Sequence, residues 1–172
     1  VFPESADEGS DFSMFVMGGF GNNWRVSVTG KRVTLVELWS RRTGGAWSAP
    51  IGKQVRLEGQ AELTPSHAAE LNALMRERIN LAQGEPRWGF DGAWYVFESG
   101  EACAGTWMPH EGTGAERLVT IAHILANQAS TSDARKQAEV EQQLLPYIRS
   151  FDHGDGDKAV TLPRSEYLYG RG

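Results

Sequence analysis

The segment 87–127 constrains the fold more than any other part of the chain, because it indicates a β-hairpin followed by a helix. Residues 93–98 and 101–108 have the composition of strands, and the dipeptide Ser99-Gly100 separates them. A two-residue loop of this kind is typical of a hairpin turn, since glycine accepts a positive φ. Apolar residues at helical spacing follow the second strand. The segment therefore predicts two antiparallel strands and a helix that packs against them.

The predicted loop also sets how the two strands pair. Trp94 then lies opposite Gly105, and Glu98 lies opposite Glu101. Two carboxylates in direct opposition destabilise a hairpin by about a few tenths of a kcal/mol. Two interpretations of this pair are open. Either both side chains are solvated at an exposed hairpin tip, where water screens them, or they hold a basic group of a partner.

The remaining pattern fits one α+β domain. Alternating polar and apolar residues predict further strands at 12–17, 24–28, 33–39 and 54–63. Helical spacing predicts helices that begin at Pro65, at about Gly114 and at Ser132 or Asp133. Two hairpins favour an antiparallel sheet with helices on one face. The sequence therefore predicts an antiparallel sheet of about six strands with about three helices packed on it, and leaves open whether the sheet is single or split.

The ends of the chain differ from its middle in composition. We expect residues 1–11 to form a loose acidic arm, residues 12–151 to form the domain, and residues 152–172 to form a tail that is loose or docked as a short strand. Within the third helix, Pro146 is expected to kink or end the helix near Leu145. The reason is that proline lacks the N–H that a helix interior uses and clashes with the preceding turn.

Charge and cysteine content restrict the classes of partner and site. The net charge of −5 argues against a nucleic-acid partner and permits a basic protein. No apolar run reaches the roughly 20 residues of a membrane-spanning helix. One cysteine, Cys103, excludes an internal disulfide and a multi-cysteine zinc site. We expect no cofactor and no metal ion, because no phosphate-binding or metal-ligand motif is present.

Cellular location and assembly stay open at this point. The chain begins at Val1 rather than Met, which leads us to expect that the numbering starts inside a longer precursor. A location in the periplasm and one in the cytoplasm are both compatible with the composition. Assembly into a homo-oligomer is also left open.

Acidic and imidazole side chains near the hairpin form the first candidate site. Glu98, Glu101, His110 and Glu111 lie close together in the sequence and would supply the acids, bases and ligands of a metal-assisted hydrolase. A chance grouping of four solvated residues is the alternative. His67 lies in a predicted first helical turn, where we expect a solvated side chain.

Two tryptophans in predicted loops form the second candidate site. Trp47 and Trp88 lie among glycine and proline residues, where large aromatic side chains serve as contact points for partners or sugars. The alternative is that they cover the ends of the sheet. With a sugar as ligand, these tryptophans would make the protein an envelope-associated binding protein.

The pattern Phe90-Asp91-Gly92-Ala93-Trp94-Tyr95-Val96-Phe97-Glu98, with Thr106-Trp107-Met108-Pro109 and an apolar helix after it, resembles a recurrent segment of small bacterial proteins of uncharacterised function. The resemblance covers about a quarter of the chain and implies a structural unit without catalytic residues. In size and acidity the chain is similar to bacterial immunity proteins, which bind and block a toxin. This similarity, the acidic balance and the absence of a catalytic motif lead us to expect a non-catalytic inhibitor of a basic toxin or enzyme. The carboxylates and loop aromatics described above, Glu98, Glu101, Trp47 and Trp88, are its expected binding residues.

Overall fold

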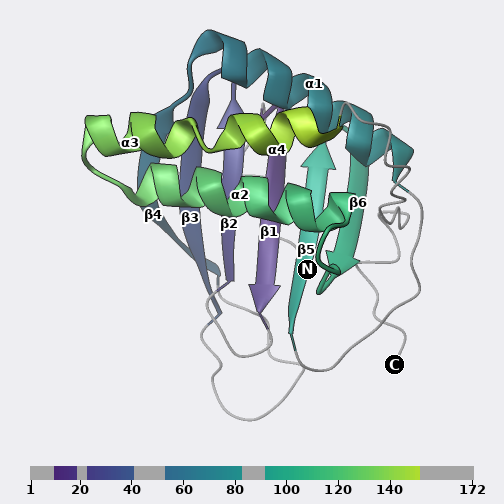
Figure 1. Cartoon of the computed structure of the whole chain (residues 1–172). Helices are drawn as coiled ribbons and strands as arrows, with labels where there is room; N and C mark the ends of the chain where they lie inside the picture. Colours follow the sequence, from purple (N-terminus) through teal and green to yellow (C-terminus); the bar gives the residue numbers. More distant parts are fainter. Residues whose placement is uncertain (1–9, 19–22, 41–52, 83–91, 152–172) are drawn as a thin grey trace.

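The computed structural model describes residues 10–18, 23–40, 53–82 and 92–151. They form one antiparallel sheet of six strands, and helices cover one of its faces (Figure 1). The strands are β1 (Phe12–Gly18), β2 (Asn23–Thr29), β3 (Arg32–Ser40), β4 (Lys53–Glu62), β5 (Ala93–Ser99) and β6 (Ala102–Trp107). The helices of the described residues are α1 (Pro65–Leu81), α2 (Gly114–Ser130), α3 (Ala134–Glu141) and α4 (Leu144–Ser150). The predicted α+β class is confirmed, and the sheet is single.

The strand order is β4-β3-β2-β1-β5-β6, and every neighbouring pair is antiparallel. The first four strands therefore form a meander, and α1 carries the chain from the β4 edge back across the sheet to β5. Helix α2 packs against β2, β3 and β4, whereas α1 packs against β1, β5 and β6. Helix α4 contacts both α1 and α2 (Figure 1). None of the helices in the described part of the chain has the length and apolar character that crossing a bilayer requires.

The β2–β3 hairpin pairs apolar residues with one another. Val28 lies opposite Val33 and Val26 lies opposite Leu35, and all four side chains are buried. The loop between the strands begins at Gly30, whose φ is 59°. A loop of this type needs a positive φ at its first residue, and glycine adopts it without strain.

The predicted register of the β5–β6 hairpin is wrong by two residues. Trp94 lies opposite Trp107, and Glu98 lies opposite Cys103, so the two carboxylates of the predicted like-charge pair do not oppose each other. The loop consists of Gly100 and Glu101, and the φ of Gly100 is 58°.

Loop chemistry explains the difference. A loop of Ser99 and Gly100 would need a positive φ at the serine as well, whereas a loop that begins with Gly100 needs it at the glycine alone. The first hairpin uses the same solution at Gly30. A shift of two residues preserves the alternation of a strand, so each side chain stays on the face that the pattern predicts.

The main core lies between the sheet and the helices. Its fully buried members include the large side chains Phe12, Met14, Leu71, Met75, Ile79, Ile121, Leu125 and Leu144. A second, smaller cluster lies on the opposite face of the sheet and consists of Phe15, Val96 and Cys103, with Met17 packed against it. The cysteine is buried, as expected for an inert thiol.

The predicted third helix is divided into α3 and α4, and the division precedes Leu145, near which we predicted it. The chain leaves the helix at Gln142 and Gln143 and re-enters it at Leu144. Pro146 explains this position, because its ring would clash with the carbonyl of the residue four positions earlier, Gln142. The break places the proline in the first turn of α4, where a backbone N–H would have no acceptor within the helix.

The predicted acidic arm ends earlier than residue 11. The Asp11 N–H donates to the Val28 carbonyl at 2.8 Å. Its carboxylate accepts from the Gly30 N–H at 2.6 Å and from the Asn72 side chain at 3.3 Å. Asp11 therefore links the β2–β3 loop to α1 and belongs to the domain. Residues 1–9 and the predicted tail 152–172 lie outside the described residues.

Candidate functional site

The four residues of the predicted hydrolase site do not come together. Glu98 is half-buried near the end of β5 and Glu101 is exposed in the hairpin loop. His110 and Glu111 are exposed and follow the other end of β6. Six residues of strand separate the two pairs, which is roughly 20 Å. Among the described residues, no three His, Cys, Asp or Glu side chains are placed to hold a metal ion.

Trp47 and Trp88, the predicted binding tryptophans, lie outside the described residues. The structure instead brings two other tryptophans together. Trp94 of β5 and Trp107 of β6 are half-buried partners across the hairpin, with ring centroids 5.4 Å apart and an interplanar angle of 59°. Alternation along β5 places them on the sheet face that the helices leave uncovered, the face of Val96 and Cys103.

Met108 follows Trp107 and has an unusual backbone. It is the one non-glycine residue with positive φ in the described part of the chain, at 39°, and 54% of its surface is exposed. A left-handed backbone at a residue other than glycine costs roughly 1 kcal/mol or more. We call Trp94, Trp107 and Met108 together the aromatic surface.

Gly92 makes the position of Met108 possible. A Cβ at Gly92 would lie 2.6 Å from Cγ of Met108 and 2.9 Å from Cζ2 of Trp107. The Met108 N–H donates to the Ala93 carbonyl at 3.3 Å. The absence of a side chain at Gly92 therefore lets the methionine lie across the start of β5, and the aromatic surface presents two indoles and a thioether at one end of the hairpin.

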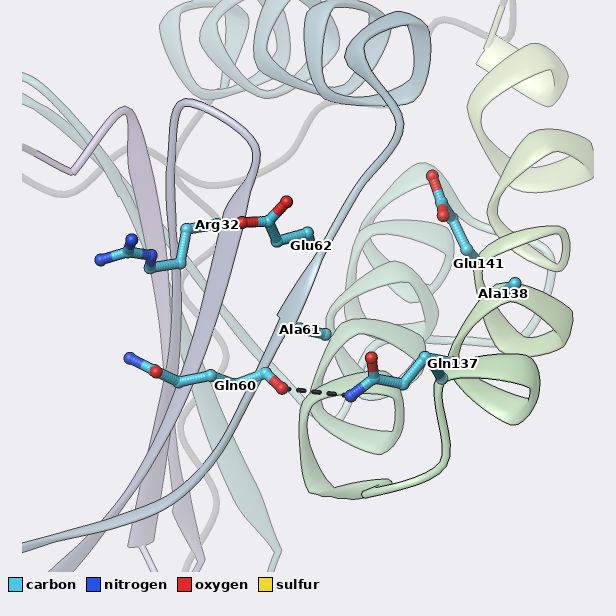
Figure 2. Close-up of a pocket in the computed structure, with 8 residues that line it drawn as sticks. Arg32, Gln60, Ala61, Glu62, Gln137, Ala138 and Glu141 are labelled. Atoms are coloured by element: carbon cyan, nitrogen blue, oxygen red, sulfur yellow. Dashed lines mark hydrogen bonds between the residues drawn. The ribbon is translucent and has the colours of Figure 1, made fainter.

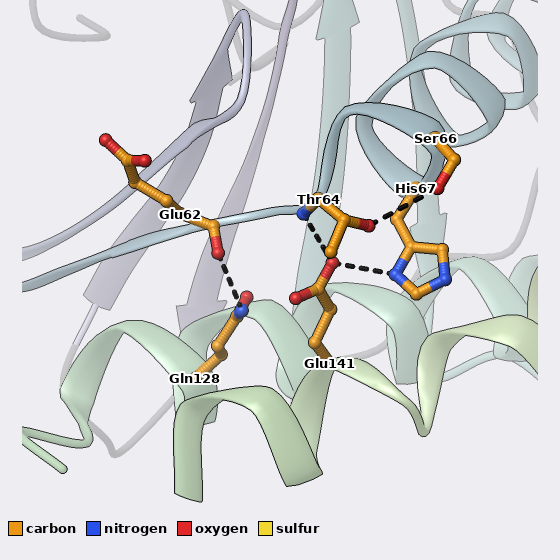
Figure 3. A network of polar contacts seen from close by, with 6 residues as sticks. All are labelled: Glu62, Thr64, Ser66, His67, Gln128 and Glu141. Atoms are coloured by element: carbon orange, nitrogen blue, oxygen red, sulfur yellow. Dashed lines mark hydrogen bonds and ion pairs between the residues drawn. The ribbon is translucent and has the colours of Figure 1, made fainter. Parts of the chain in front are cut away.

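A second arrangement of polar groups joins α3 to α1 (Figure 3). His67 is buried rather than solvated as predicted, and its Nδ1 lies 2.7 Å from Oε1 of Glu141. The Thr64 N–H donates to the same oxygen at 2.6 Å. The Thr64 side chain makes no capping hydrogen bond to α1. Glu141 therefore supplies the negative charge that the N-terminus of a helix favours, from a different helix.

The sequence contains one signal for this contact that our prediction missed. Gln137, Glu141, Leu144 and Ile148 fall on one side of the α3–α4 segment at helical spacing. A glutamate that directly precedes an apolar stripe, here Leu144 and Ile148, falls on the buried face of the helix and is rarely buried unless it has a partner. The stripe predicts a buried, paired carboxylate, although it does not identify His67 as the partner.

A pocket of about 550 Å³ lies beside this contact, between β4 and α3 (Figure 2). We call it the β4–α3 pocket; its lining residues are Arg32, Gln60, Ala61, Glu62, Ala134, Gln137, Ala138 and Glu141. The Gln137 side chain crosses the gap and donates to the Gln60 carbonyl at 3.1 Å. Glu141 is the buried residue of α3, and Val140 packs partly buried against the core, so polar contacts through Gln137 and Glu141 add to apolar packing at this helix.

Three described side chains, those of Glu62, Tyr95 and His123, have shifted pKa values. The Lys31 ammonium, 2.7 Å from Glu62, holds the pKa of that carboxyl below its ordinary value. Burial against neighbouring rings lowers the pKa of His123, whose ring lies 5.1 Å from that of Trp24 and 6.1 Å from that of Tyr95. These contacts place His123 among the aromatic side chains at the sheet–helix boundary.

The chain matches no model of a known protein family and no curated protein sequence.

Proposed function

We propose that this protein is a binding protein that recognises a basic protein through its aromatic surface, in the manner of a bacterial immunity protein that blocks a toxin. The observation that carries the proposal is Met108, a large apolar side chain that is 54% exposed on a left-handed backbone. The left-handed backbone carries a strain that an extended backbone would avoid, and such strain is concentrated at functional positions.

The composition of the surface supports a protein as partner. Tryptophan and methionine are enriched at the centres of protein interfaces, where they bury much area and adapt to the shape of the partner. Trp94 and Trp107 are half-buried and already in contact with each other. Little side-chain entropy would therefore be lost when a partner covers them.

Charge supports a basic partner. The chain carries a net charge of −5. Glu98 lies on β5 on the same face as Trp94, one strand repeat beyond Val96. A carboxylate at the edge of an aromatic contact would speed association with a basic protein and would disfavour acidic competitors.

Capture of the partner by matched variants tests the proposal. The immobilised full chain is incubated with an extract of the cells that express it, in parallel with Met108→Gln and Leu81→Gln. Leu81 is 60% exposed on α1 and is the matched control, because it is an apolar side chain of similar exposure in a different place. We expect one basic protein to bind the unaltered chain and Leu81→Gln, and to be lost from Met108→Gln.

Mass spectrometry identifies the retained protein, and titration of the purified pair gives the affinity. The Met108 change should weaken it about tenfold or more, as loss of a central interface residue does. Equal retention by Met108→Gln, or retention of acidic proteins alone, would contradict the proposal.

A further inference from the structure

One oxygen of Glu141 has no donor within the described residues. Its side chain is 5% exposed, and Oε1 accepts from both the Thr64 N–H and His67. Oε2 makes no hydrogen bond to any described residue, and it is not among their fully buried unpartnered atoms. Glu141 lines the β4–α3 pocket, and Oε2 is the oxygen of its carboxylate that no described donor engages. Figure 3 shows it turned away from Thr64 and His67.

A second acceptor beside the same strand also lacks a donor. Gln128 is fully buried and donates to the carbonyl of Glu62 at 3.4 Å, yet its Oε1 has no partner within the described residues. Two acceptors near β4 therefore lack a donor within the described residues. A carboxylate held in a pocket and short of donors favours a ligand that brings positive charge and N–H groups.

The other charged residues that line the pocket, Arg32 and Glu62, do not pair with Glu141. Glu62 is engaged by Lys31 at 2.7 Å. The Arg32 side chain points away from Glu141 (Figure 2). Ala61, Ala134 and Ala138 leave room along the walls, and small apolar walls suit the methylene stem of a long basic side chain. The volume of about 550 Å³ is within the usual range for ligand sites.

We infer that the β4–α3 pocket binds a guanidinium or ammonium group, with Oε2 of Glu141 as its counter-ion. Oε1 stays with Thr64 and His67 and keeps the carboxylate in place, so one oxygen supports the fold and the other receives the ligand. The cation comes either from a free small molecule or from a lysine or arginine of a polypeptide. This site is separate from the aromatic surface and does not depend on it.

Titration of the ¹⁵N-labelled full chain with matched ligands tests the inference. The probes are N-acetylarginine methylamide, N-acetyl-lysine methylamide and methylguanidine, and the neutral control is N-acetylcitrulline methylamide. We expect saturable shifts of the Thr64 and Gln137 amides with the cations at millimolar concentration and none with citrulline. Methylguanidine that binds as tightly as the capped amino acids indicates a free small cation, and weaker binding indicates a polypeptide side chain.

Two protein variants separate a ligand site from a structural contact. Glu141→Gln retains an acceptor for Thr64 and should weaken arginine binding about tenfold or more, as loss of a charged hydrogen bond does. Glu139→Gln removes an exposed charge from the same helix and should leave binding unchanged. If Glu141→Gln does not fold, Ala138→Leu narrows the pocket without touching the carboxylate and should weaken binding too.

Three results would overturn the inference. One is an absence of shifts with every cation at millimolar concentration. Another is equal binding of citrulline and arginine. The third is equal weakening by Glu139→Gln and Glu141→Gln, because that would assign the effect to the general charge of α3 rather than to the pocket.

Discussion

Replacement of Glu141 by alanine should destabilise the protein strongly, although the residue lies on a short helix with little apolar burial. The carboxylate is 4% exposed and receives hydrogen bonds from the Thr64 N–H at 2.6 Å and from His67 at 2.7 Å. Its removal leaves both donors without an acceptor at the start of α1. It also removes the negative charge that this helix end favours.

The expected cost is about 3 kcal/mol. Each buried donor left unsatisfied costs roughly 1–3 kcal/mol, and the lost helix-end charge adds roughly 0.5 kcal/mol. Relief from burying a carboxylate offsets part of this, because desolvation of an ion is itself unfavourable. Glu141→Gln keeps one acceptor and should cost about 1 kcal/mol.

Urea unfolding followed by far-UV circular dichroism measures these costs, with the free energy extrapolated linearly to water. Glu139→Ala is the control, since Glu139 is 63% exposed and forms a surface pair with Arg135. It should change stability by less than about 0.5 kcal/mol. A double-mutant cycle with His67→Ala measures the coupling directly. A loss below about 1 kcal/mol for Glu141→Ala, or a coupling near zero, would refute the role assigned to this contact.

The remaining predictions concern close packing and pH. Gly59→Ala should destabilise the fold by more than about 3 kcal/mol, because a Cβ there would lie 1.9 Å from the Ala129 carbonyl oxygen. In Gly100→Ala the new Cβ meets no atom within 4 Å, so this change should cost only about 1 kcal/mol of backbone strain. Urea unfolding of the two variants measures both costs. Lys31→Met should raise the pKa of Glu62 toward its ordinary value of 4.5, which NMR titration measures. Because the folded-state pKa of Glu62 is depressed, the stabilising effect of Lys31 should be present above pH 4.5 and should disappear as the pH falls through the folded-state pKa. His123 should titrate at lower pH in the folded protein than in urea, because the Trp24 and Tyr95 rings beside it exclude water and disfavour its protonated form. Its contribution to stability should therefore rise with pH and level off above 6.5, and an equal titration midpoint in both states would contradict the desolvation of the ring.

Where one face of a strand is apolar and the other polar, the sequence predicted which face of the sheet each side chain occupies. In β2 and β3 a one-residue slip would bring the apolar stripe of Val26, Val28 and Val33 into water, so the pattern excludes shifts by an odd number of residues. In β5 and β6 a two-residue slip leaves every side chain on its own face. The apolar pattern therefore does not distinguish the two registers, and the loop chemistry of Gly100 decides between them.

The candidate sites were harder to predict because they depend on contacts between distant segments. His67 and Glu141 are separated by 74 positions, and the helical pattern of either residue indicates only which face it occupies. Met108 has a left-handed backbone and lies beside Gly92, whose missing side chain leaves room for it, and no periodicity encodes this contact. The four residues proposed for a hydrolase site were grouped by sequence proximity, and the length of β6 separates them.

Site-specific photo-crosslinking tests the proposed binding surface most directly. A benzophenone side chain replaces Met108 in one protein and Leu57 in another; Leu57 is 57% exposed on β4, at the opposite edge of the sheet. After irradiation in an extract of the expressing cells, cross-linked proteins are identified by mass spectrometry. The account predicts a single basic protein cross-linked from position 108 and none from position 57. Cross-linking from position 57 alone, or of the same proteins from both positions, would contradict it.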